Sequence, residues 1–254
     1  MLTIVDDERA LAAAAAERIT SLIEKSIRER HGAIVSLTGG STPRLLYRYL
    51  GDPMQSWRAR IDWSRVHLLW GDERHVPPDD PQSNFGMAHE ALVNHVPIPA
   101  FQVHRMRGEL INVNEAAREY ESELEAAFLD ANRSDRTFDV MLLGMGEDGH
   151  VASIFPGSPL LTGSPFEVAL SVAAVWAPHL NAWRITLTPA TLLNSRAIVM
   201  MVAGTAKADA VRWALEGPEQ VDQHPAQLLR RVSDRVYWII DQLAAGRLHA
   251  APPG

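Results

Sequence analysis

The sequence contains no cysteine, which excludes disulfide bonds, thiolate catalysis and zinc sites built on cysteine. Long apolar runs are lacking as well, because no uninterrupted apolar stretch approaches the ~20 residues that a membrane-spanning helix needs. The first residues have no basic segment ahead of a long apolar one, so we expect no signal peptide. These absences predict a soluble protein of the cytoplasm.

Positive charge is also in short supply, because 24 Lys and Arg residues stand against 31 Asp and Glu residues and leave a formal net charge of −7. A general nucleic-acid binder needs a cationic surface, so this balance argues against one. A small anionic substrate is compatible with it, since a few local cations suffice for one phosphate. We therefore expect a small-molecule substrate, no nucleic-acid or membrane partner, and a monomer or a weak dimer.

Short apolar segments alternate with segments of helical character along the chain. The segments typical of buried strands are 2–5, 33–37, 66–70, 139–144, 197–202 and 236–240. This alternation predicts an α/β fold with a doubly wound, mostly parallel sheet. We expect a single domain over 1–249 and a frayed tail over 250–254. Two further strands, 168–175 and 183–187, follow each other without a helix and predict a small mixed-sheet subregion.

Helix start and stop signals separate these strands. Asp6 or Asp7 can cap a first helix, and Gly32 can end it after His31. Asp241 can cap a short last helix. The other expected helices cover 43–50, 84–94, 115–130 and 206–216.

Glycines and hydroxyls follow the second expected strand, in the segment Gly39-Gly40-Ser41-Thr42-Pro43. Pro43 suits the first turn of a helix, with Ser41 or Thr42 as its cap. Glycine lets backbone N–H groups turn toward a ligand, and the first N–H groups of a helix carry partial positive charge. The segment Gly39, Gly40, Ser41 and Thr42 therefore predicts an anion pocket. The alternative is a tight turn with an ordinary helix cap, because neither the Walker pattern nor the dinucleotide fingerprint is matched.

Three charged residues follow the strand at 66–70, where Gly71 leads into Asp72, Glu73 and Arg74. A guanidinium can bind a phosphate through its planar fork, which makes Arg74 a candidate phosphate ligand. Asp72 or Glu73 can hold Arg74 in position or accept hydrogen bonds from sugar hydroxyls. The alternative is a solvated charged loop with a salt bridge. The position of these residues at a strand end, among several strands with polar tips, favours function.

The apolar run from Val140 to Leu143 stops at Gly144, and Asp148 and His150 follow soon after. Polar groups at the carboxyl end of a buried parallel strand are where open α/β sheets place their ligands. Histidine has an unperturbed pKa of about 6.5, so His150 is a candidate general base, with Asp148 orienting its ring or shaping the turn. We also expect a short helix to begin near His150 and its positive end to keep the imidazole neutral. The alternative is a histidine that merely caps a turn.

Two further cations occupy positions from which they can reach a bound anion. Arg184 begins an expected strand, and Lys207 begins a helix just after the strand at 197–202. The alternatives are a salt bridge for Arg184 and an ordinary exposed side chain for Lys207. The ten histidines include no His-x-x-x-His pair with a nearby carboxylate, so we expect no zinc site.

Three sequence blocks together resemble one protein family. They are Leu-Thr-Gly-Gly-Ser-Thr-Pro from residue 37, Trp-Gly-Asp-Glu-Arg from residue 70, and Gly-Met-Gly-Glu-Asp-Gly-His-Val-Ala-Ser-Ile-Phe-Pro-Gly from residue 144. In this order they resemble the 6-phosphogluconolactonase family of the glucosamine/galactosamine-6-phosphate isomerase superfamily, and Arg-Ile-Thr-Leu-Thr from residue 184 is similar to a fourth block. The resemblance implies a three-layer αβα, Rossmann-like fold. It also implies hydrolysis of 6-phospho-D-glucono-1,5-lactone to 6-phospho-D-gluconate in the oxidative pentose phosphate pathway, without a metal or cofactor.

The resemblance also implies roles for single residues. His150 is the expected base that activates water, with Asp148 beside it in the same turn. Asp72 and Arg74 are expected to line the pocket. The Gly39–Thr42 loop is expected to face the sugar phosphate.

One departure from the family pattern concerns the phosphate. The family commonly has a Lys a few residues before the block that begins at Arg184, and His179 stands about where that Lys is expected. A neutral histidine would bind phosphate less strongly. Either Arg184, Lys207 or Arg74 compensates, or phosphate affinity falls as the histidine loses its proton at higher pH.

Two rival functions are open. Glucosamine-6-phosphate deaminase resembles the chain in its Asp-Gly-His turn, but its pattern continues with Asn-Glu-Pro, where this chain has Ile154 and Phe155. The acid that assists ring opening is therefore missing, and the deaminase also has a Tyr where Arg74 stands. The second rival is a non-catalytic sugar-phosphate sensor that uses the same pocket. The presence of His150 argues against this rival.

Overall fold

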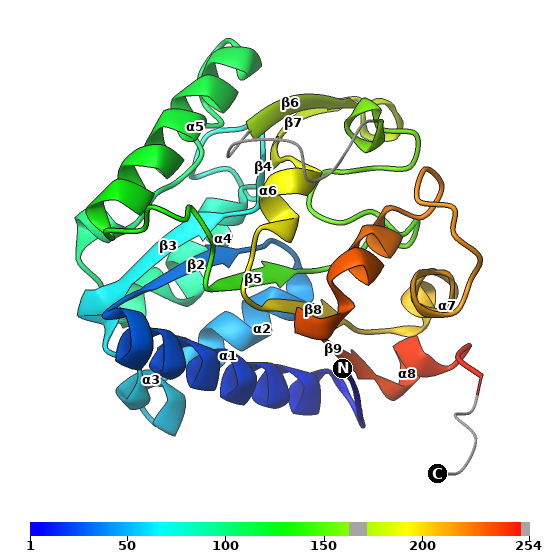
Figure 1. The fold of residues 1–254 in the computed structure, drawn as a ribbon, viewed down its shortest axis with the longest axis horizontal. Coiled ribbons are helices and arrows are strands. Elements are labelled where there is room, and N and C mark those ends of the chain that lie inside the picture. Colours follow the sequence, from blue (N-terminus) through cyan, green and yellow to red (C-terminus); the bar gives the residue numbers. More distant parts are fainter. Residues whose placement is uncertain (163–171, 250–254) are drawn as a thin grey trace.

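A six-stranded parallel sheet forms the middle layer of the protein (Figure 1). The computed structural model describes residues 1–162 and 172–249. The sheet has the strand order β1-β9-β8-β5-β2-β3, and every neighbouring pair is parallel. The strands are β1 (Leu2–Val5), β2 (Ala33–Leu37), β3 (Val66–Trp70), β5 (Val140–Leu143), β8 (Ile198–Val202) and β9 (Val236–Asp241). The expected parallel sheet is confirmed.

Three more strands form a second, smaller sheet that continues from the carboxyl end of β3. They are β4 (Asp72–Arg74), β6 (Val172–Ala177) and β7 (Ala182–Leu187), in the order β4-β7-β6. The expected subregion is confirmed, and its pairing is antiparallel throughout. Residues 72–74 belong to it because they pair with β7, so they do not form the solvated loop of the alternative interpretation. Residues 168–171 of the expected strand and the tail at 250–254 lie outside the described residues.

Helices cover both faces of the main sheet. They are α1 (Glu8–Arg30), α2 (Ser41–Gly51), α3 (Ser56–Arg60), α4 (Asn84–Ala91), α5 (Val113–Asp130), α6 (Pro189–Leu193), α7 (Ala208–Leu215) and α8 (Gln242–Ala245). α1 packs against β2, β5, β8 and β9 on the lower side in Figure 1, whereas α5 packs against β6 and β7 at the top. In the ranges 1–162 and 172–249, no helix has both the length and the apolar character needed to cross a membrane.

Two helix ends differ from the expected ones. α1 begins after its cap Asp7, as expected, but its last helical residue is Arg30, and His31 caps it in the left-handed conformation with φ 65°. Gly32 is therefore not the residue that stops the helix. α4 ends before the expected position 94, because Leu92 leaves the helical region with φ −133° and ψ −60°.

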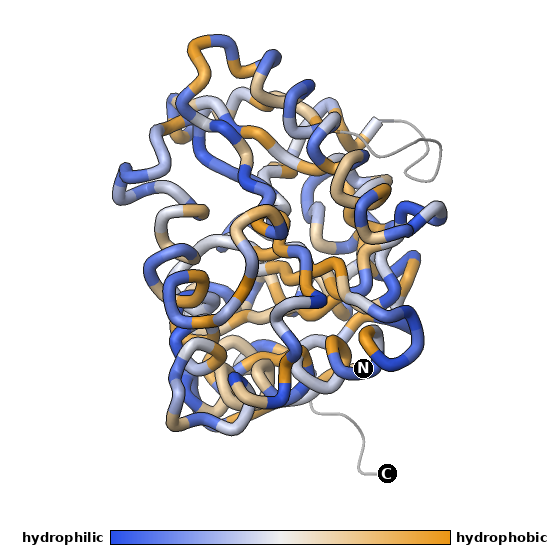
Figure 2. Tube along the Cα trace, turned by 90° about the vertical axis from the view of Figure 1, so that its left-hand side faces the viewer, coloured by the Kyte–Doolittle hydropathy of each residue, from blue (hydrophilic) through white to orange (hydrophobic). Residues whose placement is uncertain are grey.

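The hydrophobic core lies between the sheet and the helices. Figure 2 shows the hydrophobic segments concentrated in the interior of the trace. β2, β3, β5 and β8 are buried at every residue, as expected for parallel strands covered on both faces. The largest fully buried side chains include Trp70, Tyr47, Tyr120, Phe128 and Phe138.

Two of these buried tyrosines fix the ends of neighbouring strands. The Tyr47 hydroxyl on α2 accepts the N–H of Thr38 at 2.9 Å and donates to its carbonyl at 2.8 Å. The Tyr120 hydroxyl on α5 makes the same pair of bonds with Trp70, at 2.7 and 3.0 Å. Burial raises the pKa of both phenols, so both keep their protons. The peptide groups at the carboxyl ends of β2 and β3 are thereby held by the helices.

The order of strands changes direction between β2 and β5. After β2 the next strand of the main sheet is β3 on one side, and after β5 it is β8 on the other side. Open α/β sheets bind ligands at such a point, outside the carboxyl ends of the strands. The segments 38–42 and 144–150 leave the sheet here from neighbouring strands. The topology therefore brings the predicted anion loop and the predicted base to one place.

A buried charge network closes the opposite end of β5. Asp139 accepts the N–H of Ile34 at 2.9 Å and hydrogen bonds from Arg133 at 3.0 Å and Arg30 at 2.9 Å. The side chains of Asp139 and Arg133 are only 1% and 7% exposed. Burial lowers the pKa of Arg133, and the charge of Asp139 opposes this shift. Each ion is therefore needed to compensate the other.

Asp139→Ala is expected to lower the free energy of unfolding by ~3–5 kcal/mol, because it leaves the Arg133 guanidinium buried without its carboxylate. Glu125→Ala is the matched control, since it removes the exposed partner of Arg136 at 3.3 Å. Its effect should stay below about 1 kcal/mol. Urea unfolding of the purified variants measures both changes. If both variants lost the same small amount of unfolding free energy, the buried network would not stabilise the sheet.

Candidate active site

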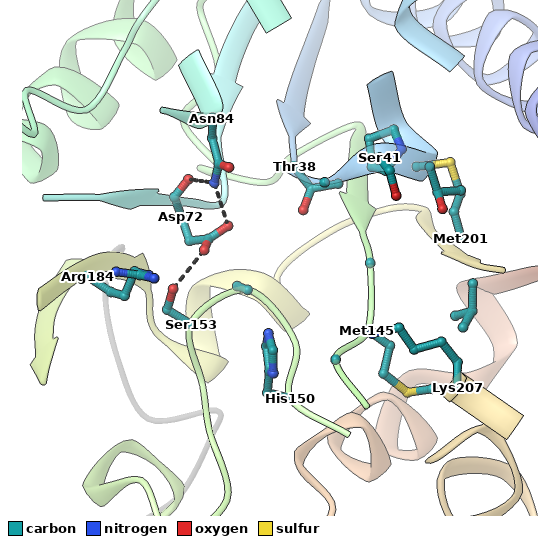
Figure 3. Close-up of a pocket in the computed structure, with 18 of the residues that line it drawn as sticks. Thr38, Ser41, Asp72, Asn84, Met145, His150, Ser153, Arg184, Met201 and Lys207 are labelled. Atoms are coloured by element: carbon teal, nitrogen blue, oxygen red, sulfur yellow. Dashed lines mark hydrogen bonds between the residues drawn. The ribbon is translucent and has the colours of Figure 1, made fainter. Parts of the chain in front are cut away.

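An open cleft of about 290 Å³ lies at the carboxyl edge of the main sheet. Its walls come from the ends of β2, β5 and β8, from β4 and β7 of the small sheet, and from the turn after β5 (Figure 3). This volume is near the lower end of the range of about 300–1,000 Å³ for small-molecule sites. The cleft therefore has the size for one small polar ligand.

His150 projects into this cleft from the turn after β5 (Figure 3). The turn is closed by its own peptide groups, since Gly146 N–H donates to the His150 carbonyl at 3.0 Å and Gly149 N–H donates to the Gly146 carbonyl at 3.1 Å. A Cβ atom at position 146 would overlap the imidazole of His150 and the carboxylate of Asp148. Glycine at 146 is thus a condition for the ring to occupy this place.

The expected helix at His150 is not formed, and that expectation was wrong. Residues 151–154 make a tight turn, with a bridge between Val151 and Ile154. Gly149 and Ala152 have φ of 81° and 49°, outside the right-handed helical region. The expected positive end of a helix beginning at His150 is therefore missing. Its neighbours are Asp148 and the ring of Phe155, whose centroid is 4.6 Å away.

Asp148 fixes the orientation of the His150 ring. Its Oδ1 lies 2.6 Å from Nδ1 of His150 and also accepts the His150 N–H at 3.1 Å. Burial raises the pKa of Asp148, but these bonds and the charge of the ring outweigh burial and lower the pKa to about 2. A carboxylate only accepts hydrogen bonds, so Nδ1 carries the proton. In the neutral ring, Nε2 is left as the proton acceptor.

The loop at 39–42 opens toward the same cleft, but it differs from the expected cap. Gly40, with φ 111°, is the cap residue of α2, and neither Ser41 nor Thr42 caps the helix. Because no side chain of residues 1–162 or 172–249 accepts their bonds, the first N–H groups of α2 are available to an anion. Gly39 is required for packing, since a Cβ there would overlap the side chain of Asn84.

Two arginines face each other across the small sheet. Arg74 on β4 is directly opposite Arg184 on β7 in the antiparallel register. In the described part of the chain both guanidinium groups bond only to backbone carbonyls, Arg74 to Gln82 at 2.5 Å and Arg184 to Trp183 at 3.0 Å. Burial lowers the pKa of Arg184, and the charge of Arg74 lowers it further. Like charges directly opposite each other destabilise a sheet, and a bound anion would relieve this repulsion.

The acidic neighbours of Arg74 have different surroundings. Glu73 turns away from the cleft and accepts the N–H groups of Arg74, Asn84 and Phe85 at 2.7–2.8 Å, which fixes the start of α4. Asp72 faces the cleft. Of the two, only Asp72 is therefore placed to contact a ligand.

Lys207 and His179 were also expected at the site, and they differ in whether they line the cleft. Lys207, at the end of a 3-10 turn (Thr205–Lys207), lines the cleft. His179 does not line it, although it stands where the family has a Lys. It is exposed on the turn between β6 and β7, and its ring meets Phe155 edge-on at 4.8 Å. The residue after it, Leu180, reaches the cleft wall instead.

Sequence reasoning missed three polar residues of the cleft. Thr38, Asn84 and Ser153 line it, and Ser153 lacked any evident partner in the sequence. Its hydroxyl donates to Asp72 at 2.7 Å, across 81 positions of the chain. Only the fold could reveal this bond. Within residues 1–162 and 172–249, no group of three or more His, Asp or Glu side chains is arranged to hold a metal ion.

A family model described as "Glucosamine-6-phosphate isomerases/6-phosphogluconolactonase" matches residues 6–238. The chain belongs to this family. A curated relative from Mycobacterium tuberculosis, named 6-phosphogluconolactonase, is 39% identical over 254 residues, which cover 97% of this chain and 98% of the relative. The expected resemblance is thus confirmed.

Solved structures of other proteins have the same fold. The 6-phosphogluconolactonase from Trypanosoma cruzi has a TM-score of 0.80 at 27% identity, covering 98% of this chain and 97% of its own. A structure described as a monomeric glucosamine-6-phosphate deaminase has a TM-score of 0.78 at 23% identity, covering 97% of this chain and 99% of its own. At 23% identity, the likeness to the deaminase concerns the fold alone. The shared fold therefore does not distinguish lactonase activity from deaminase activity.

The depressed pKa of Asp148 makes stability depend on pH in a defined direction. Its ordinary value is 3.8 and its value in the fold is about 2, so its ionised form stabilises the native state above its ordinary pKa. This contribution is lost as the pH falls from the ordinary value toward the depressed one. Asp148→Asn should therefore reduce the free energy of unfolding at neutral pH, and the difference from wild type should shrink in acid.

Urea unfolding at a series of pH values from neutral to acidic measures this difference. Asp79→Asn, in an exposed loop, is the control and should change the free energy of unfolding little. A constant difference for Asp148→Asn across the acidic range would mean that its carboxylate is not stabilised by the His150 ring.

Proposed function

We propose that the protein hydrolyses 6-phospho-D-glucono-1,5-lactone to 6-phospho-D-gluconate, a step of the oxidative pentose phosphate pathway, by attack of a water molecule activated by His150. The observation that carries the proposal is the Asp148–His150 pair, which leaves Nε2 of a histidine as a proton acceptor in a cleft lined by cations. The names of the relatives that share the family support the choice of substrate.

The proposed reaction needs one base and no covalent intermediate. Nε2 of His150 takes a proton from water as the water oxygen bonds to C1 of the lactone. The tetrahedral intermediate then collapses, the bond from C1 to the ring oxygen breaks, and the protonated His150 returns its proton to that oxygen. One water is consumed, and the new carboxylic acid ionises. A positioned base of this kind contributes about 10²–10⁴-fold in rate.

Peptide groups near His150 are the proposed donors to the oxyanion of the intermediate. Within the turn at 144–149, the N–H groups of Gly146 and Gly149 already donate to carbonyls of the turn itself. The remaining candidates that line the cleft are the N–H groups of Gly144 and Met145. Their position at the end of β5, fixed by the sheet, suits a donor that does not move during the reaction.

The sugar phosphate is proposed to bind at the start of α2. Gly40 and Ser41 line the cleft together with Arg74, Arg184 and Lys207, so amide donors and three cations surround one space. The phosphate is remote from the reacting carbon, and its binding energy can hold the lactone ring in the orientation for attack. His179 is not part of this proposed site, since it lies outside the cleft.

The described residues give no observation that favours glucosamine-6-phosphate deaminase activity. A carboxylate would be required after His150, where Ile154 is fully buried and Phe155 forms part of the cleft wall. Neither side chain can transfer a proton. We therefore expect no release of ammonia from glucosamine 6-phosphate.

His150→Ala is expected to reduce kcat for the phosphorylated lactone by about 10²–10⁴-fold, because water loses its base. A pH-stat assay of lactone opening, corrected for spontaneous hydrolysis, measures the loss. His249→Ala is the matched control, since His249 has the same kind of carboxylate contact, with Glu216 at 2.7 Å, but is exposed at the surface. The control should keep wild-type activity. Undiminished hydrolysis by His150→Ala would overturn the assignment of the base.

A further inference from the structure

Ser153 connects the turn that carries His150 to the small sheet. It is 1% exposed, and its hydroxyl donates to Oδ2 of Asp72 at 2.7 Å (Figure 3). Ser153 lies in the tight turn at 151–154 that directly follows His150, whereas Asp72 belongs to β4. The bond therefore joins two walls of the cleft that are far apart in the sequence. The proposed reaction leaves Ser153 without a role.

The Asp72 carboxylate is held by neutral donors. Nδ2 of Asn84 donates to the Asp72 carbonyl at 2.9 Å and to its Oδ1 at 3.3 Å, and Ser153 occupies Oδ2. In the described ranges no cation forms an ion pair with this carboxylate. A carboxylate has about four acceptor positions, so two remain after these bonds. Because Asp72 lines the cleft, those positions are open to a ligand that donates hydrogen bonds.

The backbone around Ser153 fixes its hydroxyl in place. Ala152 has φ 49°, which is uncommon for a residue with a side chain and persists only where its surroundings hold it. The Ser153 N–H bonds to Oγ1 of Thr186 at 3.3 Å, and Thr186 is the register partner of Asp72 on β7. Both ends of the bond between Ser153 and Asp72 are therefore attached to the same pair of strands.

We propose that Ser153 is a positioning residue that holds the Asp72 carboxylate so that its open acceptor positions receive hydroxyl groups of the sugar ring. Asp72 then selects lactones with a full set of ring hydroxyls, and Ser153 acts on selectivity through Asp72. This inference rests on the proposed lactonase function. The ligand chemistry follows from the site, because a carboxylate accepts from hydroxyls and repels the phosphate.

The test compares 6-phosphogluconolactone with its 2-deoxy and 3-deoxy counterparts. Wild-type protein should prefer the full lactone over at least one deoxy lactone in kcat/KM. Ser153→Ala should reduce kcat/KM for the full lactone by roughly 10-fold, since a hydrogen bond to a charged group is lost. Ser153→Ala should reduce kcat/KM for the disfavoured deoxy lactone by a smaller factor. The preference for the full lactone over the deoxy lactone therefore falls. Ser153→Thr retains the hydroxyl and should restore much of the preference.

A second arm asks whether Ser153 works through Asp72. In the background of Asp72→Asn, the further change Ser153→Ala should have little effect, because the two residues form one unit. Ser158→Ala is the control, since Ser158 is a buried serine of the same segment whose hydroxyl caps a different turn. It should leave the preference unchanged. Thermal unfolding of all variants shows whether they are folded, and Ser153→Cys replaces Ser153→Ala should the latter unfold.

The outcomes separate the two proposals. Wild-type protein without lactonase activity would overturn the proposed function itself. An active wild type that does not distinguish the deoxy lactones would overturn only the role of Asp72. Equal losses on all lactones for Ser153→Ala, or a loss that adds fully to that of Asp72→Asn, would overturn the positioning role of Ser153.

Discussion

The hydrogen bond between Asp148 and His150 is the interaction on which the proposed chemistry depends, and the sheet makes it possible. β5 lies next to β2 at the point where the strand order changes direction, so the turn after β5 opens beside the start of α2. Gly146 leaves room for the imidazole, and the carboxylate holds one ring nitrogen. The other nitrogen then faces a cleft whose walls include Arg74, Arg184 and Lys207. Without this bond the ring would lose its tautomer and its direction.

The net charge of the whole chain is opposite in sign to that of the basic side chains that line the cleft. The whole chain carries a net charge of −7, yet the cleft collects Arg74, Arg184 and Lys207. Two of these cations face each other across a sheet without carboxylate partners among the described residues, an arrangement that does not favour the empty fold. At the other end of β5, Asp139 is paired with the buried Arg133 and the partly exposed Arg30. Cations without ion-pair partners among the described residues at one end, and paired cations at the other, are the pattern that the proposed binding site requires.

Much of the fold was predictable, because apolar strands ending in glycine give a clear signal. The parallel sheet and the segments at its carboxyl edge followed from that pattern. The helix at His150 did not form, since Gly149 and Ala152 adopt left-handed backbone conformations that no local rule indicated. The place of His179 outside the cleft and the bond from Ser153 to Asp72 depend on how β7 pairs with β4. Such pairing joins distant segments, and its register is decided by the tertiary fold.

A crystal structure with bound 6-phosphogluconate tests the central claim most directly, because the product has one anionic group at each end. We expect its phosphate at the N–H groups that begin α2. We expect its carboxylate within hydrogen-bond reach of Nε2 of His150, directly or through one water. A product that binds in the reverse direction, with its phosphate against His150, or that binds outside the cleft would contradict the account.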